Sequence, residues 1–168
     1  MRQKVLKAFH ILRGLFRGAL THRNFALLFD WFYPEYFGII KKSLDVFKEK
    51  PWDDEVLLVI MKCIHDLLDN SSNRLRFDTW SINGLIVYKE SASLMNGLME
   101  YFDCLSPKQK PPLHKDIDRE VFKFLRLLLG MLEHCIQGNY INFAICEYYN
   151  DFTFTQLSKN IMRCLLNQ

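Results

Sequence analysis

Residues 53–70, DDEVLLVIMKCIHDLLDN, carry the pattern that decides the fold class. Asp53 and Asp54 place negative charge at the start of this stretch, where the dipole of a helix favours it. The apolar residues that follow recur at steps of three and four, as on one face of an α-helix. These residues are Val56, Val59, Ile60, Cys63, Ile64, Leu67 and Leu68. The stretch therefore predicts an amphipathic helix that frays at residues 70–72.

The residues before this stretch predict further helices of the same kind. An apolar stripe that begins at Val5 predicts a helix that ends near Thr21, which can cap the next one. Pro34 can occupy the first position of a helix, because its missing N–H is not needed there. We therefore expect one helix to end before Pro34 and another to run from Pro34 to about Lys50, where Pro51 breaks it. The apolar residues of these segments are Val5, Phe9, Leu12, Phe16, Ala19, Phe25, Leu28, Phe29, Phe32, Phe37, Ile40, Leu44 and Phe47.

The second half of the chain repeats the pattern after an irregular stretch at 70–83. Helices are expected at about 85–102, from Asp116 to a C-terminal cap at Gly138, and at about 140–148 and 155–166. Residues 104–114, rich in Pro, Lys and Ser, are typical of an exposed linker.

Eight or so short-linked helices without a strand pattern predict an all-α fold. We expect antiparallel helix pairs stacked as HEAT-type repeats in an α–α superhelix, with the repeat length of roughly 40 residues that is typical of this class. A single closed bundle is the alternative. Residues 1–168 form one helical-repeat segment of roughly four pairs, and the apolar ending at Leu165 and Leu166 suggests that the array continues.

The distribution of charge along the chain indicates candidate interface residues. The net charge is +3, but no acidic residue precedes Asp30, so the first helix is basic and Lys7, Arg13 and Arg17 are candidate interface residues. Basic residues opposite an apolar stripe can also bind a membrane surface, calmodulin or nucleic acid.

Five irregularly spaced cysteines favour buried thiols in a reducing compartment. No run is long and apolar enough for a membrane span.

No motif of a known reaction centre is present in the sequence. It lacks CxxC and HExxH metal motifs, the phosphate-binding patterns GxxxxGK[ST] and GxGxxG, and the GxSxG nucleophile elbow. The acidic pairs stand at predicted helix starts, where capping explains them. We therefore expect neither an enzyme nor a cofactor or metal site. A surface that binds other macromolecules is the favoured function.

Three irregular segments resemble parts of the exportin-seven family, the Ran-binding nuclear transport receptors of the importin-β superfamily. The first is LFDWFYPEY at 28–36, preceded by Leu12-Arg13-Gly14. The second is SNRLRFD at 72–78, followed by Asn83-Gly84-Leu85 and YKE at 88–90. The third is GNYINF at 138–143, followed by Glu147-Tyr148 and Asp151. All three occur in the family's order, although Ile82 replaces the family's Pro and Lys89 replaces its Arg.

The resemblance implies a C-terminal HEAT-repeat portion of an exportin that shuttles between nucleus and cytoplasm through the nuclear pore. It implies protein cargo and the GTPase Ran as partners, with nucleoporins as further candidates, and no nucleic acid. Residues that match the motifs are expected to anchor loops or to touch partners. They are Arg13, Phe29, Asp30, Trp31, Pro34, Arg74, Phe77, Asp78, Asn83, Gly84, Glu90, Gly138, Asn139, Tyr140 and Phe143.

Within this set, we expect Arg74, Asp78 and Glu90 to form a polar tie across the loop at 70–83. Two alternatives to the transport receptor stay open. One is a Ran-independent helical adaptor or a degenerate exportin fragment, and the other is a membrane or nucleic-acid binder acting through residues 1–25.

Overall fold

The computed structural model describes residues 2–49, 54–76, 81–104, 115–137 and 159. They form five helices, α1 (Arg2–Gly18), α2 (His22–Glu49), α3 (Asp54–Leu68), α4 (Asn83–Cys104) and α5 (Lys115–Gln137). The predicted all-α fold class is confirmed. The helix expected at 140–148 lies outside the described residues, and of the helix expected at 155–166 only residue 159 is described, in helical conformation. Of the linker expected at 104–114 only Cys104 is described, and it is the last residue of α4.

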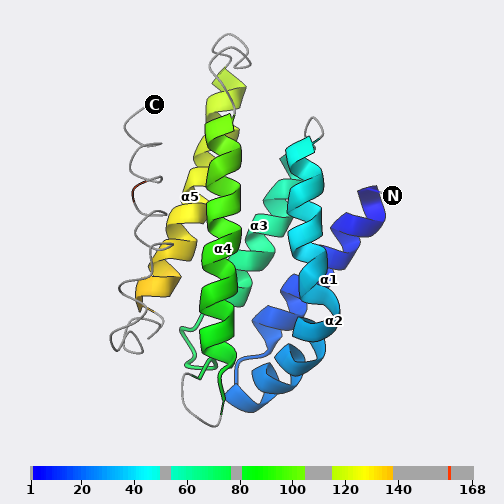
Figure 1. Cartoon of the computed structure of the whole chain (residues 1–168), viewed down its shortest axis with the longest axis vertical. Coiled ribbons are helices and arrows are strands. Elements are labelled where there is room, and N and C mark those ends of the chain that lie inside the picture. The colour runs from blue at the N-terminus through cyan, green and yellow to red at the C-terminus, as the bar shows by residue number, and fades with distance from the viewer. Residues whose placement is uncertain (1, 50–53, 77–80, 105–114, 138–158, 160–168) are drawn as a thin grey trace.

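The helices pack as stacked pairs in two layers (Figure 1). In one layer α3 lies between α1 and α5, and in the other α2 contacts α4. The helices of the first layer begin at Arg2, Asp54 and Lys115, so successive pairs start farther apart than the sequence pattern suggested. The difference arises because α2 alone has 28 residues and a folded loop separates α3 from α4.

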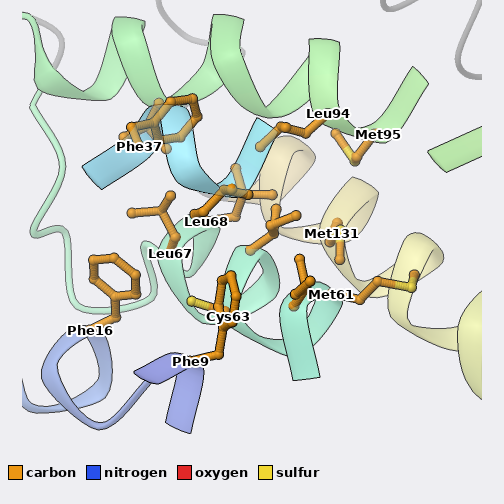
Figure 2. Packing of buried hydrophobic residues seen from close by; sticks show 14 of the residues in the cluster. Phe9, Phe16, Phe37, Met61, Cys63, Leu67, Leu68, Leu94, Met95 and Met131 are labelled. Atoms are coloured by element: carbon orange, nitrogen blue, oxygen red, sulfur yellow. The ribbon is translucent and has the colours of Figure 1, made fainter. Parts of the chain in front are cut away.

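The core is centred on α3, which contacts each of the other four helices described (Figure 2). Figure 2 shows Phe9 and Phe16 of α1 on one side of α3, with Leu94 and Met95 of α4 on the other. The rings of Phe16 and Phe32 meet edge to face at 5.1 Å, and both are fully buried.

A buried thiol lies within this core. Cys63 is a free cysteine with no exposed surface. Burial, reinforced by the charge of Asp66, raises the pKa of the Cys63 thiol to about 12. The thiol therefore stays protonated and acts as a small apolar side chain, as the sequence led us to expect.

The break predicted at Pro34 is absent, because α2 runs through it as one helix. Pro34 cannot donate the usual hydrogen bond to the carbonyl of Asp30, which normally weakens a helix interior. Aromatic packing on both sides of the proline offsets this loss. Phe29 stacks on Tyr33 at 5.2 Å, and Tyr33 meets Phe37 at 5.4 Å, so the rings bridge the weak turn.

The predicted helix starts agree with the structure more closely than the predicted break at Pro34 does. The backbone N–H of Asn24 donates to Thr21 Oγ1 at 3.3 Å, which is the predicted cap of α2. The next helix begins at Asp54 as expected, and α4 begins at Asn83, just before the predicted Leu85.

Candidate interaction surface

The loop after α3 is held by one buried cation. Arg74 is 2% exposed, and its guanidinium donates to the backbone carbonyls of Asp69 at 2.8 Å and Asp66 at 2.5 Å. It also donates to the carbonyls of Phe16 and Ala19 at the end of α1. Carbonyls at a helix C-terminus lack partners within the helix. Arg74 therefore joins the C-terminal ends of α1 and α3, and it lies 4.8 Å from the ring centroid of Phe25.

Asparagine side chains complete the loop. The N–H of Leu75 donates to Asn70 Oδ1 at 2.7 Å, and the N–H of Arg76 donates to Asn83 Oδ1 at 3.1 Å. Gly84 then donates its N–H to the carbonyl of Arg76. Asn73 adopts the left-handed conformation, with φ 55°, which asparagine tolerates better than most residues. The second family motif thus builds a loop fastened to the start of α4.

Two members of the predicted polar tie, Arg74 and Glu90, take part in different contacts. The bonds of Arg74 described above go to backbone carbonyls, whereas Glu90 joins α4 to α2. Tyr33 donates its hydroxyl to Glu90 Oε1 at 3.2 Å, and Lys41 Nζ lies 2.5 Å from Glu90 Oε2. Burial and the adjacent carboxylate of Glu90 raise the pKa of Tyr33. Asp78, the third predicted member, lies outside the described residues.

The candidate basic interface divides into one structural residue and two exposed ones. Arg13 and Arg17 of α1 both face the carboxylate of Asp66 on α3, at 2.7 and 3.0 Å. The side chain of Arg13 is 14% exposed, but that of Arg17 is 64% exposed. Arg13 therefore fastens α1 to α3. Arg17 and the exposed Lys7 remain the residues that a partner could reach.

The motif at 28–36 is part of a helix and not a loop. Phe29 is buried, whereas Asp30, Trp31 and Pro34 are exposed. Asp30 therefore lies inside α2 and does not anchor a loop as the motif led us to expect. The ring of Trp31 lies 4.7 Å from that of Tyr36 and leaves 48% of the residue exposed. Sequence reasoning assigned Trp31 to locking a loop, and the structure places it instead on the outer face of α2.

An apolar groove runs between α1 and α2, with a volume of about 310 Å³. Ile11 and Leu15 line it from α1, and Trp31, Tyr36 and Ile39 line it from α2. All five side chains are exposed large apolar residues. Sequence reasoning missed this groove, because none of these five residues belongs to the apolar stripes that it predicted for α1 and α2.

A second groove of about 770 Å³ lies between α3 and α5 and carries Lys62, Lys123 and Arg126. The rings of His65 and His134 meet here at 4.4 Å. Burial, followed by the nearby His134, lowers the pKa of His65. A side chain at Gly130 would come within 2.8 Å of His65 Nε2, so the glycine makes room for the imidazole.

We also searched the described residues for a metal-binding cluster and for a membrane-spanning helix. That part of the chain holds no group of three His, Cys, Asp or Glu placed to bind a metal ion. None of its helices has the length and apolarity needed to cross a membrane. Six of the predicted site residues lie outside the described ranges, namely Phe77, Asp78, Gly138, Asn139, Tyr140 and Phe143.

Stacked helix pairs define the chain as a helical-repeat segment. Comparison with known proteins confirms the resemblance that the motifs predicted. The chain is 26% identical to exportin-7 of Dictyostelium discoideum over 168 residues, covering 99% of this chain and 16% of that protein. It is also 26% identical to exportin-7-B of Xenopus laevis over 156 residues and to human Ran-binding protein 17 over 160 residues. Each of these two alignments covers 93% of this chain and 14% of the relative.

The similarity to exportin-7 and Ran-binding proteins thus extends over nearly the whole chain, which spans about one sixth or less of these relatives. None of the three is named as an enzyme. No protein-family model matches the chain. No solved structure matches it.

Proposed function

We propose that this chain serves as part of an exportin-like nuclear transport receptor that binds protein cargo, Ran or both. The observation that supports this proposal most directly is the alignment of 93–99% of the chain with proteins named exportin-7 and Ran-binding protein 17. Such a receptor shuttles between nucleus and cytoplasm and requires no cofactor.

The geometry supports a binding role in two ways. The helix pairs stack in layers, and repeats of this kind create extended binding surfaces. In addition, α1 presents Lys7 and Arg17 on its exposed surface without any acidic residue of its own. Exposed charge of one sign increases the rate at which partners of opposite charge associate.

The direct test is binding to Ran loaded with a GTP analogue or with GDP. The protein should be immunoprecipitated from its own cells, and its mass compared on an immunoblot with the 20.0 kDa of this chain. We expect a clear preference for the GTP form of Ran. Binding of cargo that ignores the nucleotide, with no binding of Ran, would replace the proposal with a Ran-independent adaptor.

Point variants can localise the contact. Lys7→Ala and Arg17→Ala should weaken partner binding, whereas Arg23→Ala, an exposed arginine on α2, serves as the matched control. Arg13→Ala is unsuitable for this purpose because Arg13 fastens α1 to α3. An affinity of the Lys7→Ala and Arg17→Ala variants equal to that of the unsubstituted chain would exclude these two residues from the contact.

A further inference from the structure

The groove between α3 and α5 combines aliphatic side chains with cationic ones. Its volume of about 770 Å³ is enough to hold several side chains of a ligand. Leu58, Leu127 and Leu129 supply the aliphatic part of its lining, and Leu129 is 40% exposed. Lys62 and Arg126 line the same groove. This mixture fits a ligand that presents both apolar and charged groups.

Helical spacing turns the charged side chains of α5 towards the groove. Residues at steps of three, four and three share one side of a helix, and four such residues of α5 line the groove, namely Lys123, Arg126, Gly130 and Glu133. Met131 belongs to the buried side of α5 and packs in the core (Figure 2). The groove is therefore bordered by the side of α5 that the core leaves uncovered.

The charge of this lining is mainly positive. Three cationic side chains, those of Lys62, Lys123 and Arg126, accompany one carboxylate, that of Glu133. His65 adds no charge near neutral pH, because its burial lowers the pKa of the imidazole. The lining therefore favours a ligand of negative charge.

The acidic residues of α3 beside His65 are already engaged. Asp66 binds two arginines of α1, and Asp69 accepts the N–H of Ser71. Lys62 and Arg126, in contrast, have no ion-pair partner within the part of the chain that the structure describes. These two cations are therefore the ones that carboxylates of another molecule can reach.

The longer segments outside the described ranges do not offer a matching charge. Residues 105–114 contain two lysines and no acidic residue. Residues 138–168 contain two acidic and two basic residues. A run of carboxylates that complements the groove is therefore expected from a partner protein.

The lining also favours a peptide over nucleic acid. Proteins that bind single strands usually stack the bases on aromatic side chains. The described residues that line this groove include four leucines but no Phe, Tyr or Trp. A peptide can place aliphatic side chains on the leucines and carboxylates on the cations, whereas a phosphate backbone uses only the cations.

We propose that the α3–α5 groove docks an acidic linear segment of a partner protein. Carboxylates of the segment would pair with Lys62 and Arg126, and its aliphatic side chains would lie on the leucines of the groove. The guanidinium of Arg126 suits this role, because its planar fork can bind a carboxylate through two parallel hydrogen bonds. The inference goes beyond the proposed function and does not depend on it.

The test uses three labelled peptides of equal length, titrated with the full chain and followed by fluorescence anisotropy. The first has glutamates around a central pair of leucines. Glutamine replaces every glutamate in the second, and serine replaces the leucines in the third. We expect the first to bind and the other two to bind at least about tenfold more weakly. Added salt should weaken the first complex.

Arg126→Gln and Arg23→Gln form a matched pair, because both arginines are exposed and only Arg126 lines the groove. Arg126→Gln should lower the affinity for the first peptide about tenfold, and Arg23→Gln should leave it unchanged. Lys62→Gln should act as Arg126→Gln does, with Lys42→Gln as its control. Circular dichroism would check that each variant is folded.

Charge reversal distinguishes a direct contact from an indirect effect on the fold. Arg126→Glu should lose the first peptide and should gain affinity for a peptide in which lysine replaces every glutamate. A variant with a damaged groove would lose the first peptide without this gain.

Four outcomes would overturn the proposal. They are no binding of the first peptide, equal binding of either control peptide, equal loss with Arg126→Gln and Arg23→Gln, and displacement of the peptide by a single-stranded oligonucleotide or anionic vesicles that bind more tightly. Ran binding measured on Arg126→Gln keeps this result separate from the proposed function, because peptide binding can be lost while Ran binding is retained.

Discussion

Arg13 Nε lies 2.7 Å from Asp66 Oδ2, although 53 residues separate them in the chain. The contact joins α1 to α3 beside the fully buried thiol of Cys63. Arg17 approaches the other oxygen of the same carboxylate at 3.0 Å but remains largely exposed. One acidic residue on α3 thus accepts two arginines from α1 in different environments.

The two arginines should differ in their effect on stability. Because Arg13 is largely buried, Arg13→Met leaves one oxygen of a buried carboxylate poorly paired and should lower the free energy of unfolding by about 1–3 kcal/mol. Arg17→Met should change it by less than about 0.5 kcal/mol, since exposed ion pairs contribute little. Urea unfolding followed by circular dichroism measures both. Equal losses would mean that burial does not distinguish the two contacts.

Arg74 should be more sensitive than any exposed arginine. Arg74→Met leaves several helix-end carbonyls without a donor in a buried site and should lower the free energy of unfolding by about 2–4 kcal/mol. Arg74→Lys should recover only part of this loss, because an ammonium group cannot spread several bonds as a guanidinium does. Arg23→Met is the exposed control and should stay within about 0.5 kcal/mol of the unsubstituted chain.

Pro34 should weaken α2 despite the aromatic packing around it. Pro34→Ala restores an N–H that can donate to the carbonyl of Asp30 and should raise the free energy of unfolding by about 1–3 kcal/mol. The neighbouring exposed Glu35→Ala should change it little. A loss of stability in Pro34→Ala would show that the proline itself is needed, for example by shaping the helix for the Trp31–Tyr36 contact.

The packing of α3 on α5 should weaken in mild acid. The pKa of His65 is lowered in the folded protein, so the folded state resists protonation that the unfolded chain accepts. Its contribution is therefore fully present above the ordinary pKa of about 6.5 and is lost as the pH falls through that value towards the lowered folded-state pKa. The groups that face His65 are His134, Asp66, Asp69 and Arg17, and its burial is the largest cause of the shift.

Comparing urea unfolding at pH 7.5 and pH 5.5 tests this prediction. The unsubstituted chain should lose more stability between these values than His65→Gln, which cannot titrate. An identical loss in both proteins would assign the acid sensitivity to another group.

Periodicity located the apolar faces of the described helices, because apolar residues at steps of three and four share a face in a helix, but the break predicted at Pro34 divided α2 wrongly. All seven apolar residues predicted on one face of α3 are buried, but Leu57 and Met61 are buried as well, because α3 contacts helices on several sides. The family resemblance was likewise visible in three short motifs, two of which the structure places at a loop and within α2.

Tertiary structure decided everything that depends on residues far apart in the chain. Pro34 reads as a helix start locally, yet α2 runs through it, and the rings of Phe29, Tyr33 and Phe37 pack on one another across that turn. Arg74 was expected to join a polar tie across the loop, but the carbonyls that it binds at the ends of α1 and α3 come from residues that the loop sequence does not identify. Trp31 and Ile11 lie outside the predicted apolar stripes, and the packing of the described helices brings them to one groove and leaves both exposed. A sequence pattern specifies which residues share a face, and only the packing of one helix on another determines whether that face is buried.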